Sequence, residues 1–226
     1  MKTETAAWEI LGEARAPHRF LQPVDAHDRA LLRAEAEEVL RLTGRNDWCL
    51  IAVPIRDWDR DLTPWEAPPV FGERSFGAGA GQTLHFLTEQ LIPSLERNGP
   101  EGAAYYLCGY SLAGLFALWA VCESGRFAGA AAASPSLWYP GWTEYARAHA
   151  VKAEAVYLSL GDREEKTRHP VMARVGEAVR LQFALLSEAG IRPHLRWAEG
   201  NHFRDSEKLT ARGIAWLLEQ SDRNRT

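Results

Sequence analysis

Apolar runs of strand length alternate with segments of helical periodicity along most of this chain, and this alternation limits the folds open to it. Residues 49–55 form a continuous apolar run, which is typical of a strand buried on both faces of a sheet. Strands separated by helices predict an α/β fold with a mostly parallel central sheet and helices on both faces. The predicted strands are 18–24, 49–55, 103–108, 127–133, 155–160 and 191–197, and the predicted helices are 25–42, 83–95, 112–123, 171–189 and 207–220.

Composition and charge limit the kinds of molecule that this chain is expected to bind. Apolar residues make up 46% of the 226 residues, which is too many for a disordered chain. The 26 basic and 30 acidic side chains give a net charge of −4 and no basic stripe for a nucleic-acid backbone. No repeat or linker interrupts the pattern, so residues 1–226 are expected to form a single domain that binds a small molecule.

Targeting signals and cysteines point to the cytoplasm. No segment reaches the ~18 apolar residues of a membrane span. Glu4 and Glu9 interrupt the N-terminal stretch, where a signal peptide needs an unbroken apolar core. Cys49, Cys108 and Cys122 are odd in number, lie in apolar runs and lack Cys-x-x-Cys spacing. They predict buried, reduced thiols, without a disulfide framework or a zinc site, in a cytoplasmic protein with no membrane contact.

A serine stands at the junction between a predicted strand and a predicted helix. Ser111 lies within residues 109–114, which read Gly-Tyr-Ser-Leu-Ala-Gly. A serine at such a tight turn is held in a strained conformation that exposes its hydroxyl, and it needs small residues two positions away on either side. Gly109 and Ala113 meet this need, and the N–H of Leu112 at the helix start would face an oxyanion. The alternative is a serine that only caps an ordinary helix.

A nucleophilic serine needs a base, and in this strand–turn–helix arrangement the base follows the serine at the end of a later strand. His202 comes directly after the last predicted strand and before the final helix. Of the other later histidines, His149 lies in a helical stretch, His169 in an acidic loop and His194 within a strand. His202 is therefore the predicted base, and the alternative is a loop histidine that caps a helix.

The acid that would orient the imidazole is less narrowly defined. The loop after the strand at 155–160 contains Asp162, Arg163, Glu164, Glu165 and Lys166. Any of the three carboxylates could reach the imidazole, and the others would then form a solvated cluster with the two cations. In related sheets the acid commonly stands three residues past the glycine that ends the strand. This spacing from Gly161 selects Glu164, with Asp162 as the runner-up.

Aromatic residues gather in the predicted loops on both sides of Ser111. They are Trp58, Trp65, Tyr110, Trp138 and Trp142. Loops at the carboxyl ends of parallel strands form the ligand crevice of such sheets, so Tyr110, Trp58, Trp65 and Trp138 predict an apolar acyl or aryl pocket. The alternative is that these tryptophans only cover the edge of the sheet.

Four segments carry a family resemblance. They read DWDRDLTPW (57–65), GYSLAG (109–114), SPSLWY (134–139) and GNHF (200–203). From about residue 18 onward the chain resembles the putative esterase family of α/β-hydrolases, which includes enterochelin (siderophore) esterases, feruloyl esterases, esterase D and the mycolyltransferases. The resemblance implies a serine hydrolase with Ser111 as nucleophile and His202 as general base.

The chain departs from this family pattern in one loop. The His-Gly segment that is common in hydrolase oxyanion loops is absent. The loop expected to take its place follows the strand before the helix at Thr83, and it reads Arg-Asp-Trp-Asp over residues 56–59. The backbone N–H of Arg56 or Asp57 is therefore the expected second oxyanion donor.

These features predict a serine hydrolase that cleaves carboxylic esters through a Ser-His-acid triad and an acyl-enzyme, with no cofactor and no metal. Two alternatives stay open. The same triad would serve an acyltransferase, and a catalytically silent hydrolase fold would serve as a binding module. The intact order of serine, acid and histidine speaks against the silent fold.

Overall fold

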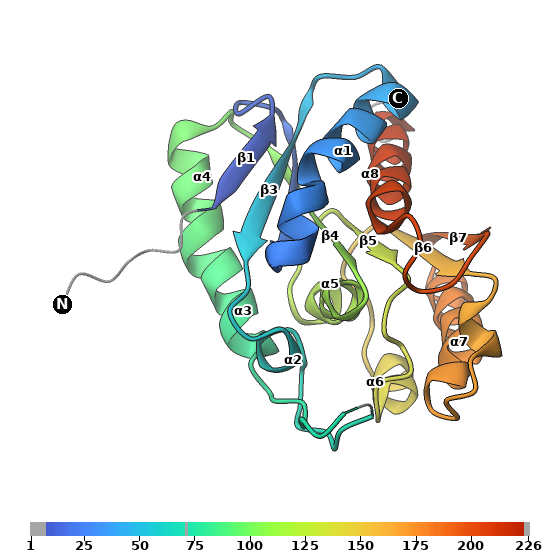
Figure 1. Cartoon of the computed structure of the whole chain (residues 1–226). Helices are drawn as coiled ribbons and strands as arrows, with labels where there is room; N and C mark the ends of the chain where they lie inside the picture. The colour runs from blue at the N-terminus through green and yellow to red at the C-terminus, as the bar shows by residue number, and fades with distance from the viewer. Residues whose placement is uncertain (1–7, 71, 224–226) are drawn as a thin grey trace.

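The computed structural model describes residues 8–70 and 72–223, which contain a seven-stranded sheet (Figure 1). The strands are β1 (Glu9–Gly12), β2 (His18–Val24), β3 (Trp48–Pro54), β4 (Ala104–Tyr110), β5 (Gly129–Ala133), β6 (Ala155–Gly161) and β7 (Arg192–Ala198). Their order is β1-β3-β2-β4-β5-β6-β7, in which β1 is antiparallel and every other pairing is parallel. The predicted α/β fold with a mostly parallel sheet is confirmed.

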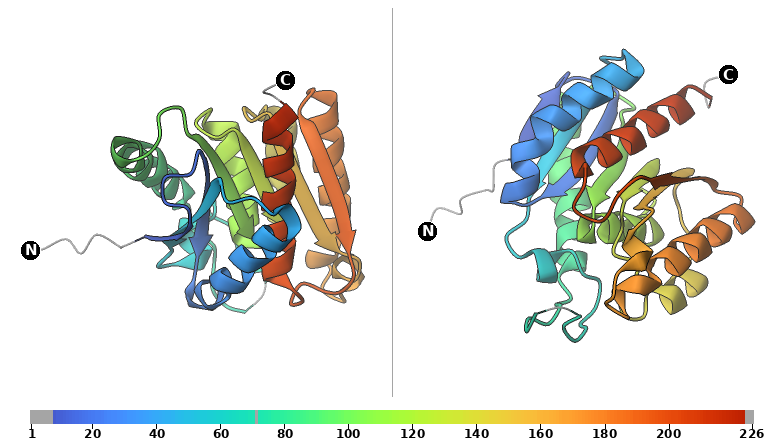
Figure 2. Two further views of the ribbon diagram at one scale, coloured as in Figure 1. Left: turned by 90° about the horizontal axis from the view of Figure 1, so that it is seen from above. Right: turned by 45° about the vertical axis from the view of Figure 1, so that its right-hand side comes forward.

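Helices cover both faces of this sheet (Figure 2). They are α1 (Ala26–Thr43), α2 (Trp58–Asp61), α3 (Ala80–Phe86), the π-helical η1 (Leu87–Leu91), α4 (Ile92–Asn98), α5 (Leu112–Glu123), α6 (Trp142–Ala148), the short 3₁₀ turns η2 (Glu164–Lys166) and η3 (Met172–Arg174), α7 (Val175–Glu188) and α8 (Ser206–Arg223). Helices α1 and α8 bury their apolar residues with one face of the sheet, and α3 to α7 bury theirs with the other. In the described part of the chain, no helix has both the length and the apolar character that a membrane crossing requires.

Several elements differ from the sequence prediction, since β1, α2, α6 and η2 are not among the predicted strands and helices. Strand β1 was not predicted, because four residues at a sheet edge are too short for a clear alternation. The predicted helix at 83–95 exists, but it contains the wider turn η1, in which Ile92 N–H bonds to the carbonyl of Leu87, five residues back. This turn ends two residues before Pro93, which has no N–H and whose ring clashes with a regular helical carbonyl. The N-terminal stretch considered as a signal peptide lies mostly in residues 1–7, outside the described residues.

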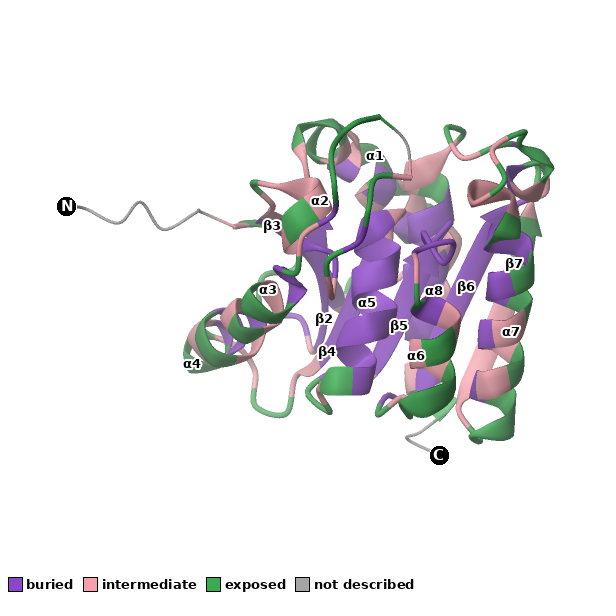
Figure 3. Cartoon of the chain, turned by 90° about the horizontal axis from the view of Figure 1, so that it is seen from below, coloured by how far each residue is buried: buried purple, intermediate pink, exposed green. Residues whose placement is uncertain are grey.

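Helix α5 is the central helix of the fold and lies against β4 and β5 (Figure 3). Every residue from 112 to 122 is buried, which explains why this segment is apolar on all sides. A helix with no solvent-exposed face has little freedom to move, so the residue at its start is held firmly in place. That residue is Ser111.

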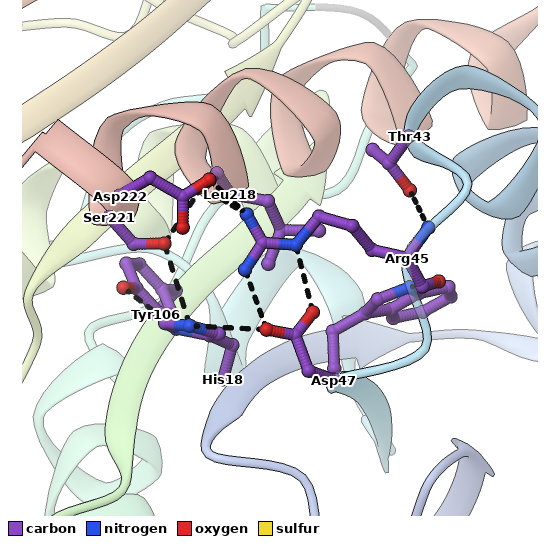
Figure 4. Close-up of polar contacts among 9 residues, drawn as sticks. His18, Thr43, Arg45, Asp47, Tyr106, Leu218, Ser221 and Asp222 are labelled. Carbon is purple, nitrogen blue, oxygen red and sulfur yellow. Dashed lines mark hydrogen bonds and ion pairs between the residues drawn. The ribbon is translucent and has the colours of Figure 1, made fainter.

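At the end of the sheet opposite to Ser111, a polar network joins the loop before β3 to the end of α8 (Figure 4). The guanidinium of Arg45 donates to both carboxylate oxygens of Asp47 at 2.8 and 2.7 Å. It also donates to the carbonyl of Leu218 at 2.9 Å and to the carboxylate of Asp222 at 2.7 Å. These hydrogen bonds hold the pKa of Asp47 below its usual value. The network therefore anchors α8, which follows the loop that carries His202.

We expect Asp47→Asn to lower the free energy of unfolding at neutral pH by about 1 kcal/mol, because Arg45 loses its two-point partner while Asp47 is partly screened by water. The folded-state pKa of Asp47 is lowered, so the ionised form stabilises the fold above the unfolded pKa of about 4, and this contribution is lost as the pH falls through the folded pKa. Wild type and variant should converge in acid. Urea unfolding at several pH values measures the difference in the free energy of unfolding. The control is Glu96→Gln, which removes an exposed ion pair with Arg126 and should leave the free energy of unfolding almost unchanged. A gap that is constant with pH would contradict the assignment.

Candidate active site

Ser111 occupies a strained turn between β4 and α5. Its backbone has φ +57° and ψ −120°, a conformation that L-residues rarely adopt. A Cβ on Gly109 would lie 2.6 Å from the Cβ of Ala113, so the turn requires a residue without a side chain there. The Ser111 side chain makes no capping hydrogen bond to the helix. The alternative of a simple helix cap therefore does not describe this serine.

The imidazole of His202 lies between Ser111 and Glu164. Its Nε2 is 3.0 Å from Ser111 Oγ, and its Nδ1 is 2.8 Å from Glu164 Oε2. The loop between β7 and α8 carries His202, and the hydroxyl of Tyr110 fixes that loop by donating to the His202 carbonyl at 2.6 Å. Burial raises the pKa of Tyr110, so its phenol stays protonated and able to donate. Three side chains from three separate loops thus form one hydrogen-bonded chain.

Glu164 is buried, and both of its carboxylate oxygens take part in hydrogen bonds. Its Oε1 accepts hydrogen bonds of 2.7 Å from the hydroxyl of Ser134 and 2.7 Å from the N–H of Gly161. Ser134 itself has φ +40°, a strained conformation at the end of β5. The sequence prediction missed Ser134 as a site residue. The only signal was its place at the start of the SPSLWY segment.

The other two candidate acids have different partners. Asp162 accepts a 2.9 Å hydrogen bond from the N–H of Gly200, two residues before His202. Glu165 forms a two-point ion pair with Arg180 at 2.8 and 2.9 Å. The structure therefore brings Glu164 to the imidazole, and neither Asp162 nor Glu165.

Ser136 is a second residue that the sequence prediction missed. Its hydroxyl lies 3.1 Å from Ser111 Oγ, and its N–H donates to the Ser111 carbonyl at 3.1 Å. The residue is fully buried. Ser111 Oγ therefore has two polar neighbours, the imidazole on one side and a hydroxyl on the other.

Of the predicted oxyanion donors, the N–H of Leu112 is available, and the N–H of Asp57 is not. The N–H of Leu112 is at the first turn of α5, and within residues 8–70 and 72–223 it has no backbone acceptor. The prediction of Asp57 is wrong: its N–H donates to Asp61 Oδ2 at 3.1 Å, and its loop follows β3, which pairs with β1 and β2 instead of β4. Arg56 lines a separate cavity of about 250 Å³ at the end of β3.

The strand order explains this error. The neighbour of β4 on this side is β2, and Leu21 of β2 pairs with Leu107 of β4. Three residues further along both strands, Val24 comes level with Tyr110. The loop that adjoins Ser111 is therefore the one that follows β2 and opens α1, beginning at Asp25.

Half of the predicted aromatic pocket lies at the site. Trp138 and His202 line the same cavity of about 490 Å³, and the ring of Tyr110 is 5.1 Å from the imidazole. Trp65 instead donates to the Pro140 carbonyl at 2.7 Å and packs on neighbouring tyrosines, and Trp58 packs against the core at the start of α2. The prediction that Trp58 and Trp65 line the pocket is therefore wrong, because both serve packing.

Comparison with known proteins places this chain in a family. Residues 33–204 match the family model described as "Putative esterase". The chain belongs to this esterase family. The expectation of a carboxylic-ester hydrolase is thereby confirmed. A search of curated protein sequences finds no match.

Solved structures resemble this esterase in fold. The siderophore hydrolase EstA from Aspergillus nidulans is 21% identical with a TM-score of 0.67, over 92% of this chain and 84% of that one. The IroE-like serine hydrolase from Shewanella oneidensis is 19% identical with a TM-score of 0.73, over 94% and 75%. A ferulic acid esterase is 11% identical with a TM-score of 0.61, over 96% and 91%. The likeness confirms the α/β-hydrolase fold.

Proposed function

We propose that this esterase hydrolyses small-molecule carboxylic esters with Ser111 as nucleophile, His202 as general base and Glu164 as the acid that orients the imidazole. The observation that carries the proposal is the position of His202, within 3.0 Å of Ser111 Oγ and 2.8 Å of Glu164 Oε2. Both distances are suitable for proton transfer and for fixing the tautomer. The strained backbone of Ser111 supports the same role.

The reaction proceeds in two steps. In the first, Ser111 Oγ attacks the ester carbonyl, and its proton passes to His202 Nε2 and then to the leaving alcohol. In the second, His202 takes a proton from water, and the resulting attack releases the acid and restores the Ser111 hydroxyl. The Leu112 N–H and the first N–H groups of the loop after β2 would bind the oxyanion.

Ser136 has a supporting part in both steps. Its hydroxyl would donate to Ser111 Oγ whenever that oxygen carries negative charge, which occurs as the nucleophile forms and again as the acyl group leaves. No proton is transferred along this hydrogen bond. The hydroxyl thus stabilises charge at the same oxygen twice in each cycle.

Acyl transfer to an alcohol would use the same three side chains. The His202 side chain is 21% exposed, so water can reach the imidazole, which favours hydrolysis over transfer. Purified protein should convert para-nitrophenyl acetate and butyrate to the free acids, even with glycerol present as a competing acceptor. Absence of turnover would contradict the proposed function, and a glyceryl ester as the main product would favour the transferase.

Ser134→Ala is expected to lower kcat by about tenfold and leave KM nearly unchanged, because Glu164 loses one of the donors that fix its carboxylate. Steady-state kinetics on the acetate ester measures both constants. Ser159→Ala is the matched control, since it removes an equally buried hydroxyl that makes no hydrogen bond to Glu164 in the described part of the chain. Equal losses in the two variants would mean that Ser134 acts only on packing.

The cysteines bear on where this esterase works. Cys49, Cys108 and Cys122 are all buried. Burial raises the pKa of each thiol, which keeps the thiols protonated and unreactive. They support the cytoplasmic location, which stays a prediction.

A further inference from the structure

The cavity beside His202 has a distinctive lining. The lining includes the cations Arg163 and Lys166, the apolar side chains of Trp138, Met172 and Phe203, and Glu164 and His202. Its volume of about 490 Å³ is enough for a substituted aromatic ring. The triad acid and base thus form one wall, and the other walls are available to a substrate. The inference below rests on the proposed function and assigns this cavity a substrate group.

The position of the imidazole decides which half of the ester enters this cavity. His202 Nε2 gives its proton to the leaving oxygen, so that oxygen must lie within hydrogen-bond distance of Nε2. The rest of the alcohol extends from this oxygen on the side of the histidine. The cavity that His202 and Phe203 line is therefore the site for the alcohol half of the ester.

Two of the three Arg, Lys and Glu residues that line the cavity are cations, Arg163 and Lys166, and the third, Glu164, faces His202. Arg163 and Lys166 are exposed, and neither forms an ion pair within the described residues. Of the neighbouring carboxylates, Glu164 bonds to His202 and Glu165 pairs with Arg180, while Asp162 accepts from the N–H of Gly200 and does not line the cavity. Two cations beside the catalytic imidazole thus have room for an anionic partner from the substrate.

The remaining walls are apolar and aromatic. Trp138 is largely buried, and Phe203, 90% exposed, stands edge-on to the imidazole with ring centroids 5.6 Å apart. Met172 adds a flexible apolar side chain. Such walls suit a ring, and they leave its polar substituent to the two cations.

We propose that the preferred substrates are esters whose alcohol half is an aromatic alcohol with a carboxylate substituent, held by Arg163 and Lys166. The carboxylate would accept hydrogen bonds from the guanidinium of Arg163 and the ammonium of Lys166, while the ring packs against Trp138 and Phe203. The acyl half lies outside this cavity and is not restricted by it.

A matched pair of acetate esters tests this selectivity. para-Carboxybenzyl acetate and para-carbamoylbenzyl acetate share the acyl group and nearly the same shape, but only the first is an anion. We expect wild-type kcat/KM to be about fivefold to tenfold higher for the carboxylate ester at low salt. The ratio should fall toward one in about 1 M salt, because exposed charges are screened.

Variants assign the effect to the two cations. Arg163→Gln with Lys166→Gln should reduce the ratio to about one, and Lys166→Gln alone should reduce it about twofold. Arg168→Gln is the matched control, since it removes an exposed cation of the same segment that does not line the cavity. This variant should keep the wild-type ratio.

The outcomes separate the two proposals. Equal wild-type rates on both esters would overturn the charge selectivity and leave ester hydrolysis intact, as would a ratio that survives in the double variant. Failure to cleave either ester, together with failure on para-nitrophenyl acetate, would overturn the proposed function itself.

Discussion

Ser111→Ala is expected to lower kcat for para-nitrophenyl butyrate by about 10⁴-fold or more, because the substitution removes the hydroxyl on which the proposed acyl-enzyme forms. The hydroxyl is the only part removed, and alanine keeps the Cβ that the strained turn already accommodates. The melting temperature should therefore change by no more than about 3 °C. Steady-state kinetics and thermal unfolding on the same preparation measure both effects.

Ser124→Ala is the matched control for this substitution. Ser124 caps the far end of the same helix, α5, and its loss should leave kcat within about twofold of wild type. A Ser111→Ala protein that retains wild-type activity would dismiss the mechanism, whatever the fold does.

Glu164→Gln has the second largest expected effect, a fall in kcat of about 10³- to 10⁴-fold. The carboxylate of Glu164 accepts from three donors: the Ser134 hydroxyl, the Gly161 N–H and the imidazole. Glutamine has only one acceptor oxygen. Its amide N–H₂ would therefore face either the donors from Ser134 and Gly161 or the Nδ1 of His202, and in the second case Nδ1 would have to accept and the imidazole would change its tautomer. The imidazole would then present the wrong nitrogen to Ser111. Kinetics of Glu164→Gln over the neutral pH range measures the loss.

Glu165→Gln provides the comparison for that loss. It removes a neighbouring carboxylate whose partner is Arg180, and we expect kcat within about threefold of wild type. Asp162→Asn tests the runner-up acid. If Asp162→Asn costs more activity than Glu164→Gln, Glu164 is not the acid of the triad.

The parts of the fold that follow local rules were predictable. Helix 112–123 was predicted at its observed bounds, because Ser111 and the glycines around it mark the turn and every residue behind it is apolar. Glu164 was favoured from its spacing to Gly161, and the structure shows that the same glycine also donates to its carboxylate.

The errors arise where position depends on contacts between distant segments. Asp57 seemed suitable because its loop follows a strand, yet the order of parallel strands is set by tertiary packing and puts β2, and not β3, beside β4, the strand that leads to Ser111. Trp65 has the sequence context of a pocket residue, and its role depends on Pro140, far along the chain. The hydroxyls of Ser134 and Ser136 reach the site through the turn after β5, where the positive φ of Ser134 has no sequence signature.

Covalent labelling with a fluorophosphonate tests the central claim most directly, because an activated serine reacts with this reagent much faster than an ordinary hydroxyl does. The folded protein should take up one adduct per chain, mass spectrometry should locate it on the peptide that contains Ser111, and His202→Ala should slow the labelling strongly. A folded protein that stays unlabelled, or that carries the adduct on another residue, would contradict the assignment of Ser111 as the nucleophile.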